Sequence, residues 1–308
     1  MTAKFEPAYL RLGMVELRQR AEQALQSLAD CRLCARECRV NRLASQFGSC
    51  HTGRHALISS AFPHFGEERP LVGRGGSGAI FFAWCNLHCV FCQNYDISQL
   101  GHGQQCDAET LVRAMLELQR LGCHNLNFVS PSHVVPQILE ALALAAQSGL
   151  RLPLVYNTGT YDSLDTLALL DGIVDIYMPD TKYADERNAR KYSGAPGYPE
   201  VMKAALKEMH RQVGDLEMDR AGIARRGLLV RHLVLPNGLA GSKKTLEFIA
   251  HQLSANTYLN IMAQYRPEYR AMQFDELSRR PTHEDIEEVV RTATQLGLAR
   301  LDDRWALT

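Results

Sequence analysis

Short apolar runs and longer amphipathic segments alternate along the chain from residue 79 to residue 296. The apolar runs have the length of buried strands, and the amphipathic segments repeat apolar residues at helical spacing. The pattern predicts strands at 79–84, 125–130, 152–157, 173–178, 228–235 and 258–264, and helices at 108–121, 134–148, 162–170, 185–192, 199–213, 242–253 and 283–296. Strand–helix units in series favour a parallel sheet with right-handed crossovers. Since eight units close a barrel, six predict an α/β fold with an open, partial (β/α)6 barrel.

The part of the chain before residue 79 follows a different pattern. Residues 7–30 have helical periodicity, residues 31–53 are basic, turn-rich and dense in cysteine, residues 56–62 have the pattern of a short strand, and residues 63–78 form a connector rich in Gly, Pro and charge. We therefore predict three parts: an N-terminal helical and four-cysteine metal-binding segment over 1–78, the barrel over 79–270, and a helical closing segment over 271–308. Thr282 is predicted to cap the last helix, with Glu284 and Asp285 in its first turn.

Composition narrows the classes of partner. The chain has 308 residues, 46% of them hydrophobic, and a formal net charge of zero with the charges interspersed. This predicts neither a nucleic-acid nor a membrane partner. The first residues lack an apolar signal core, and no apolar run approaches the ~18 residues of a membrane span. We expect a cytoplasmic protein, in which the nine cysteines are metal ligands rather than disulfides.

Three cysteines follow the first barrel strand directly. Cys85, Cys89 and Cys92 have the spacing Cys-x3-Cys-x2-Cys. Three thiolates hold three irons of a cubane cluster and leave the fourth iron open for a small molecule. A zinc site would need a fourth ligand, which His88 would supply. A non-catalytic electron-transfer or metal-binding module is a further alternative. The open iron and the full barrel favour an enzyme with its site at the strand carboxyl ends.

This triplet, with Phe91 just before the third cysteine, resembles the signature of the radical S-adenosylmethionine superfamily. The longer stretch 78–98 is similar to homologues of pyruvate formate-lyase activating enzyme that have a cysteine-rich N-terminus, and the resemblance covers residues 30–270. It implies an oxidoreductase in which Cys85, Cys89 and Cys92 hold a catalytic [4Fe–4S] cluster. S-adenosylmethionine would bind the open iron and be cleaved by one electron to a 5′-deoxyadenosyl radical, which abstracts hydrogen from a substrate.

The resemblance also implies partners. A low-potential donor such as flavodoxin or ferredoxin would reduce the cluster, and a glycine Cα in a partner protein would lose the hydrogen atom. Radical modification of a peptide, an amino acid or another small metabolite is the alternative.

Polar residues follow the next two strands. Ser130 and Ser132 stand where many radical enzymes have a Gly-Gly-Glu run that holds the amino group of the methionine moiety. Their hydroxyls would either offer hydrogen bonds to that ligand or cap the following helix. Asn157 and Thr158 end the third strand, and by the resemblance Thr158 lies near the sulfonium ligand.

Charged residues mark the fourth and fifth strands. Asp180 and Lys182 match the Asp-x-Lys element of glycyl-radical activating enzymes. A carboxylate attracts a sulfonium strongly in a cleft of low dielectric, whereas the alternative is a surface ion pair worth little. Arg231 and His232 interrupt an apolar strand, and the period of two puts them on opposite faces. We expect Arg231 to face the inside of the barrel, where the resemblance implies that it binds the carboxylate of S-adenosylmethionine. We expect His232 to pack on the outside.

Four more cysteines, Cys31, Cys34, Cys38 and Cys50, have the spacing Cys-x2-Cys-x3-Cys-x11-Cys. Four thiolates would close either a tetrahedral zinc site or a second [4Fe–4S] cluster. The segment is poor in apolar residues, so metal binding should contribute to its folding. Cys106 and Cys123 have no partner spacing, and we expect them to be free structural thiols.

Overall fold

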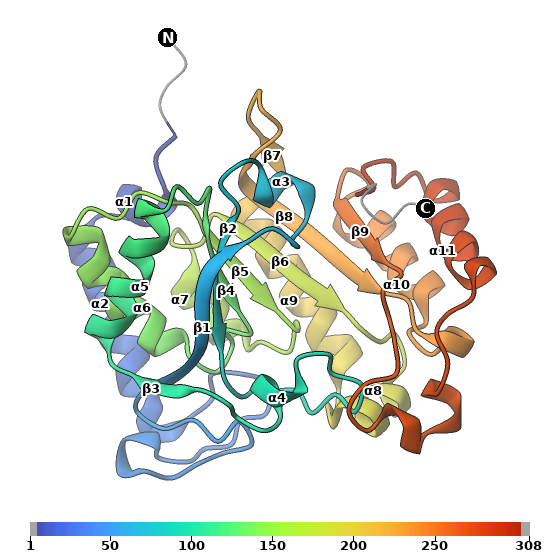
Figure 1. The fold of residues 1–308 in the computed structure, drawn as a ribbon, viewed down its shortest axis with the longest axis horizontal. Helices are drawn as coiled ribbons and strands as arrows, with labels where there is room; N and C mark the ends of the chain where they lie inside the picture. The colour runs from blue at the N-terminus through green and yellow to red at the C-terminus, as the bar shows by residue number, and fades with distance from the viewer. Residues whose placement is uncertain (1–4, 303–308) are drawn as a thin grey trace.

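Six parallel strands form the centre of the fold. The computed structural model describes residues 5–302, and within them the parallel strands pair in the order β2-β4-β5-β6-β8-β9 (Figure 1). Their bounds are β2 Ser77–Phe82, β4 Leu126–Val129, β5 Leu154–Thr158, β6 Ile176–Thr181, β8 Ala224–Leu233 and β9 Tyr258–Met262. The predicted α/β fold with an open, partial barrel is confirmed.

Three antiparallel strands extend this sheet. β1 (Ala56–His64) pairs with β2, β3 (Gln104–Cys106) pairs with β1, and β7 (Glu217–Met218) pairs with β8. The sequence pattern predicted β1 but neither β3 nor β7. Both are too short to show a period of two, which needs at least four residues.

Among the six parallel strands, β6 and β8 differ most from their predicted bounds. The predicted fourth strand ends at residue 178, before a proline that cannot donate to the ladder. β6 nevertheless continues to Thr181, because pairing with β8 resumes at Asp180 and Thr181. Asp180 therefore lies within a strand rather than after it. β8 begins at Ala224, earlier than the predicted residue 228.

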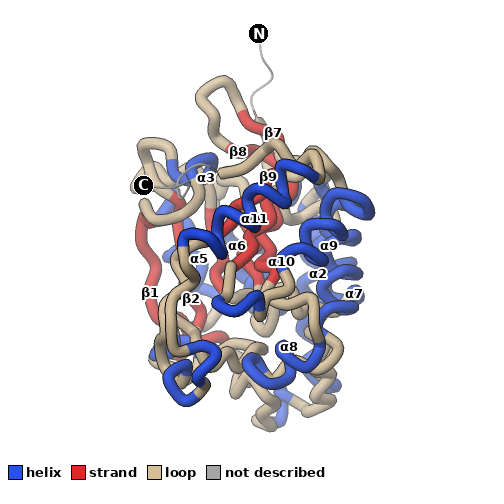
Figure 2. The backbone as a smooth tube through the Cα atoms, turned by 90° about the vertical axis from the view of Figure 1, so that its right-hand side faces the viewer, coloured by secondary structure: helices blue, strands red, loops and turns tan. Residues whose placement is uncertain are grey.

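Most of the helices cover the outer side of the curved sheet (Figures 1 and 2). They are α1 Ala8–Leu12, α2 Met14–Gln26, α5 Ala108–Arg120, α6 Val135–Gln147, α7 Leu164–Leu170, α8 Glu186–Ser193, α9 Tyr198–Val213, α10 Ser242–Phe248 and α11 His283–Gln295. Two short helices, α3 Arg69–Val72 and α4 Tyr95–Ser98, lie in loops at the two ends of the strands. α6 is almost wholly buried because α2 and α5 pack against it. α11 begins with the predicted cap: Thr282 and Asp285 form a reciprocal capping box.

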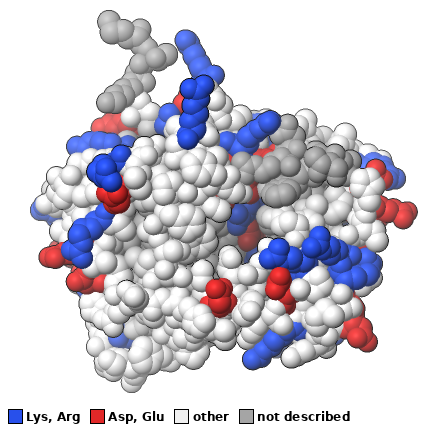
Figure 3. Space-filling view, in the orientation of Figure 1, with Lys and Arg blue, Asp and Glu red and all other residues white. Residues whose placement is uncertain are grey.

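The surface shows interspersed charge. On the face seen in Figure 3, basic and acidic side chains lie interspersed, with a broad uncharged area left of the centre. Among residues 5–302, no helix is long and apolar enough to cross a membrane.

Candidate active site

A cavity of about 250 Å³ opens at the carboxyl ends of the parallel strands. The loop after β2 forms one wall, and the ends of β4, β5, β6, β8 and β9 form the rest. Most of the residues predicted for the site line it: Cys85, Cys89, Phe91, Cys92, Ser130, Asn157, Thr158, Asp180, Lys182 and Arg231. Parallel strands explain this convergence, because their carboxyl ends meet at one edge of the sheet.

Hydrogen-bond donors contact two of the three sulfurs. The Ser193 hydroxyl donates to Cys89 Sγ at 2.9 Å, and the Leu87 amide lies 3.4 Å from Cys85 Sγ. Burial raises the pKa of the Cys85 thiol to about 12 and that of Cys89 to about 11, while the Lys182 charge acts to lower both pKa values. Burial therefore outweighs the donors and the cation, so without a metal Cys85 and Cys89 are neutral thiols, and metal binding would displace their protons.

The donor set fits a [4Fe–4S] cluster held by three thiolates. The three sulfurs open onto one cavity and leave space beside them for a ligand. Within residues 5–302, no three His, Cys, Asp or Glu side chains converge on the position of a single ion. A cubane takes one protein ligand per iron, so it needs its thiolates farther apart than a single ion does.

A buried network of charges lies beside these thiols. Asp180 accepts hydrogen bonds from Arg231 Nε and Lys182 Nζ, both at 2.7 Å, and Arg231 Nη2 donates to Asn157 Oδ1 at 2.7 Å. The three charged side chains are 14–15% exposed. Burial acts to raise the pKa of Asp180, but the charges of Arg231 and Lys182 outweigh it, so the pKa lies below its usual value. The carboxylate is therefore ionised at neutral pH, as a sulfonium partner requires.

Two glutamates of the connector complete this network. Glu67 Oε2 lies 3.6 Å and Glu68 Oε1 3.8 Å from Arg231 Nη1, and both carboxyls are buried. Glu68 also accepts a hydrogen bond from Asn260 at 2.8 Å. Burial raises the pKa of Glu67 to about 7, against the opposing effect of Arg231. The sequence analysis missed both residues, since charge in a Gly- and Pro-rich connector normally indicates solvent exposure.

Ser132 lies outside the cavity lining and does not cap α6. Its hydroxyl is 2.9 Å from Thr158 Oγ1, which donates to Asp162 Oδ2 at 2.6 Å. Tyr156 donates to the other oxygen of Asp162 at 2.8 Å. These polar groups are buried behind the cavity wall, where they fix the side chain of Thr158.

Arg231 and His232 lie on opposite faces of β8, as predicted. Arg231 lines the cavity, whereas His232 is fully buried on the outside, where its ring bonds to Thr181 and Ser242. Burial lowers the pKa of His232 to about 4. Phe91 packs edge-on against Tyr265, which also lines the cavity.

Comparison with known proteins identifies the family. The family model for the radical SAM superfamily matches residues 79–215. An uncharacterized protein of Methanocaldococcus jannaschii, MJ0674, is 31% identical over 302 residues, which cover 96% of this chain and 82% of that protein. The chain belongs to the radical SAM superfamily. Membership implies a [4Fe–4S] cluster and S-adenosylmethionine, which agrees with the three thiols of this radical SAM chain.

Solved structures similar to this radical SAM chain are diverse. A domain of pyruvate-formate lyase-activating enzyme from Bacteroides vulgatus is 15% identical, with a TM-score of 0.36 over 50% of this chain and 82% of that chain. SuiB from Streptococcus suis bound to S-adenosylmethionine is 11% identical and has a TM-score of 0.48; the match covers 71% of this chain and 47% of that chain. A radical SAM methyltransferase from Sphaerobacter thermophilus is 14% identical and has a TM-score of 0.47; the match covers 71% of this chain and 64% of that chain.

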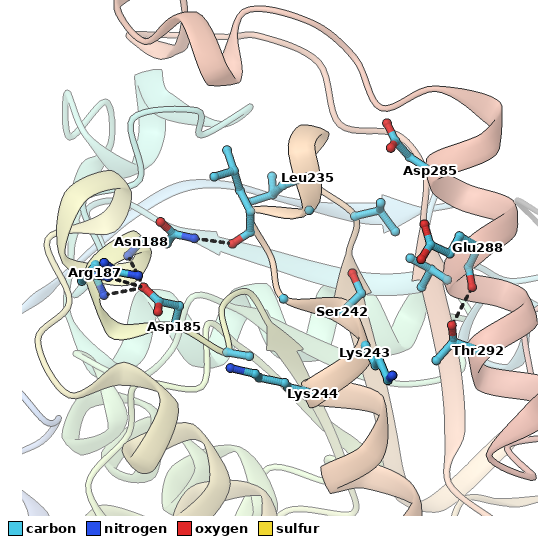
Figure 4. Close-up of a pocket in the computed structure, with 16 residues that line it drawn as sticks. Asp185, Arg187, Asn188, Leu235, Ser242, Lys243, Lys244, Asp285, Glu288 and Thr292 are labelled. Carbon is cyan, nitrogen blue, oxygen red and sulfur yellow. Dashed lines mark hydrogen bonds and ion pairs between the residues drawn. The ribbon is translucent and has the colours of Figure 1, made fainter.

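A larger cavity of about 470 Å³ lies elsewhere on this radical SAM chain, between α8, α10 and α11 (Figure 4). Acidic and basic side chains line it together, among them Asp185, Lys243, Lys244 and Glu288. It contains no cysteine and none of the residues predicted for the site. This cavity is larger than the candidate site, but it lacks the thiols that would hold the catalytic cluster.

The remaining cysteines fall into two groups. Cys31, Cys34, Cys38 and Cys50 line one small pocket together. Cys106 and Cys123 line neither this pocket nor the cavity, and both are buried free thiols.

Proposed function

We propose that this radical SAM chain is an enzyme that cleaves S-adenosylmethionine reductively and abstracts a hydrogen atom from a substrate. The observation that carries the proposal is that three thiols and a buried carboxylate–guanidinium pair share one cavity at the strand carboxyl ends. When bound, the cluster and S-adenosylmethionine would together supply a 5′-deoxyadenosyl radical.

The chain's own residues would bind and orient the ligand. Cys85, Cys89 and Cys92 would hold the cluster. The planar fork of Arg231 suits the carboxylate of the ligand, and the ionised Asp180 suits its sulfonium. Around these groups, Phe91, Ser130, Asn157, Thr158 and Lys182 would form the remaining walls, with Ser132 holding Thr158 from behind.

The substrate we propose is a glycine Cα in a partner protein, with flavodoxin or ferredoxin as the electron donor. This follows the Asp-x-Lys element, whose two side chains meet in the cavity beside the thiols. A peptide, an amino acid or a small metabolite is the alternative source of the hydrogen atom.

The first experiment tests cleavage itself. The anaerobically reconstituted chain is incubated with S-adenosylmethionine and dithionite, and 5′-deoxyadenosine is measured. We expect release by the wild type, loss of release in Cys89→Ala because two thiolates hold a cubane poorly, and full release in the control Cys123→Ala, a buried thiol outside the cavity. No release from a cluster-replete wild type would favour a non-catalytic module.

A second experiment tests the substrate. A partner protein labelled with α-deuterated glycine is incubated with the enzyme, and deuterium in 5′-deoxyadenosine is measured by mass spectrometry. Transfer from this protein supports a glycyl-radical activating function. Transfer only from labelled peptides or small metabolites would replace it with the alternative.

A further inference from the structure

Four cysteines in the N-terminal segment surround one small void, the four-cysteine pocket. Cys31, Cys34, Cys38 and Cys50 all line it, and three of the four are buried. The void between them measures about 10 Å³, the space of one water-sized sphere, so its size favours neither zinc nor a cubane. Among residues 5–302, however, no three of these side chains converge on the position of a single ion, as a zinc ion with its sulfurs about 2.3 Å away requires. A cubane takes one thiolate per iron and keeps the four thiolates farther apart.

A buried cation points into this pocket without a carboxylate partner. Arg42 is 1% exposed, and its Nη1 lies 3.8 Å from Cys31 Sγ. Its other hydrogen bonds go to the backbone carbonyls of Gly53 and His133. Arg36 also lines the pocket, and its buried Nη2 has no hydrogen-bond partner. Glu37 also lines the pocket, but it is exposed, and among residues 5–302 no ion pair joins Arg42 or Arg36 to a carboxylate.

A buried, unpaired charge is costly. The buried guanidinium of Arg42, together with the buried Nη2 of Arg36, therefore calls for a negative partner inside the pocket. Four neutral thiols do not supply one. Four thiolates on a cubane cluster do, because the thiolate charges exceed the positive charge of the iron–sulfur core.

The pocket is continuous with the loop that carries the catalytic thiols. Asn86, the residue after Cys85, lines the four-cysteine pocket, and its carbonyl accepts a hydrogen bond from Arg36 Nε at 2.6 Å. Farther along the same loop, His88 Nε2 lies 2.6 Å from the Ser49 hydroxyl. A centre in this pocket would therefore brace the loop of the catalytic site from behind.

We propose that Cys31, Cys34, Cys38 and Cys50 hold a second [4Fe–4S] cluster, ligated by four thiolates and neutralised in charge by Arg42 and Arg36. This site is independent of the catalytic thiols and of the proposed reaction.

Metal analysis of the full chain, purified without oxygen, tests the proposal. In a Cys85/Cys89/Cys92→Ala triple variant we expect iron and sulfide at about four each per chain, with the absorption and electron-spin signals of a cubane after reduction. The wild type should hold about twice as much iron, and Cys34→Ala should lose half of it. Zinc at about one per chain, or neither metal in a folded chain, would overturn the proposal. Because the readout is metal content, failure of S-adenosylmethionine cleavage would not affect it.

A charge variant tests the role of Arg42. Arg42→Met keeps an unbranched apolar stem but removes the charge of the side chain, and we expect the iron retained by the triple variant to fall by at least half. Arg32→Met is the matched control, since Arg32 lies on the same segment but is exposed and paired with Asp30. Equal iron in both variants would overturn the charge argument.

Discussion

Arg231 is the most heavily engaged side chain of the candidate site. Its guanidinium donates to Asp180 and Asn157, and two further carboxylates lie within 4 Å of it. The pKa of Glu67 is about 7, so only above that pH do the three carboxylates outnumber Arg231 and Lys182, by one negative charge. A ligand that carries a sulfonium would offset this charge.

Arg231→Lys tests this reading at the scale of one residue. A lysine keeps the charge but cannot reproduce the two directed hydrogen bonds of the fork. We expect binding of S-adenosylmethionine, measured by titration, to weaken by roughly 1.5–3 kcal/mol, the value of a hydrogen bond to a charged group. Arg226→Lys is the control, because Arg226 lies on the same strand but bonds to the carbonyl of Gln212 outside the cavity. Unchanged binding in Arg231→Lys would exclude the proposed contact.

Asp180→Asn is the complementary change. It removes the negative charge and leaves Lys182 without its carboxylate. We expect the affinity for S-adenosylmethionine to fall by a similar amount, roughly 1.5–3 kcal/mol. The affinity for S-adenosylhomocysteine, which lacks the sulfonium charge, should fall less. Equal losses for both ligands would show that Asp180 does not act on the sulfonium.

At the scale of elements, one buried carboxyl joins three segments at the end of the sheet opposite the site. Asp175, just before β6, accepts hydrogen bonds from the amides of Ala8 in α1 and Leu154 in β5, at 2.8 and 2.9 Å. Burial raises the pKa of this carboxyl to about 7, although the two amides act to lower it. Folding therefore favours the protonated form.

This raised pKa predicts a pH dependence of stability. Below pH about 4, both the folded and the unfolded chain hold the proton; between pH about 4 and 7, only the folded chain does. The protonated Asp175 therefore contributes to the free energy of unfolding at low pH. This contribution, on the order of a few kcal/mol, is lost as the pH rises through about 7. Urea denaturation at pH 5 and pH 8 should show a smaller pH difference in Asp175→Asn than in the wild type. Equal differences would contradict the prediction.

At the scale of the whole molecule, the N-terminal helices share the core of the barrel. Leu17 of α2 is fully buried and belongs to the same apolar core as Leu139 of α6. The boundary at residue 78 stays a prediction. We expect Leu17→Ala to lower the free energy of unfolding of the entire chain by about 2–5 kcal/mol, in one transition. A separate early transition, with the rest unchanged, would show that residues 1–78 unfold alone. Val15→Ala, at an exposed position of α2, is the control.

The sequence by itself determined the features that follow from local periodicity and spacing. Apolar runs and helical repeats predicted the six parallel strands and their helices, because each element must bury one face. The period of two placed Arg231 inside and His232 outside. The spacing of Cys85, Cys89 and Cys92 put three thiols in one loop, since eight residues cannot carry them far apart.

Only the tertiary structure decided which distant residues meet these elements. Glu67 and Glu68 lie more than 150 residues before Arg231, and nothing in the local pattern of a charged connector indicates that it folds inward. The same holds for Asn86, which joins the catalytic loop to the four-cysteine pocket, and for Ser132, which lies behind the cavity wall rather than in it. Periodicity fixes the face on which a side chain lies, but the packing of the whole chain decides what that face meets.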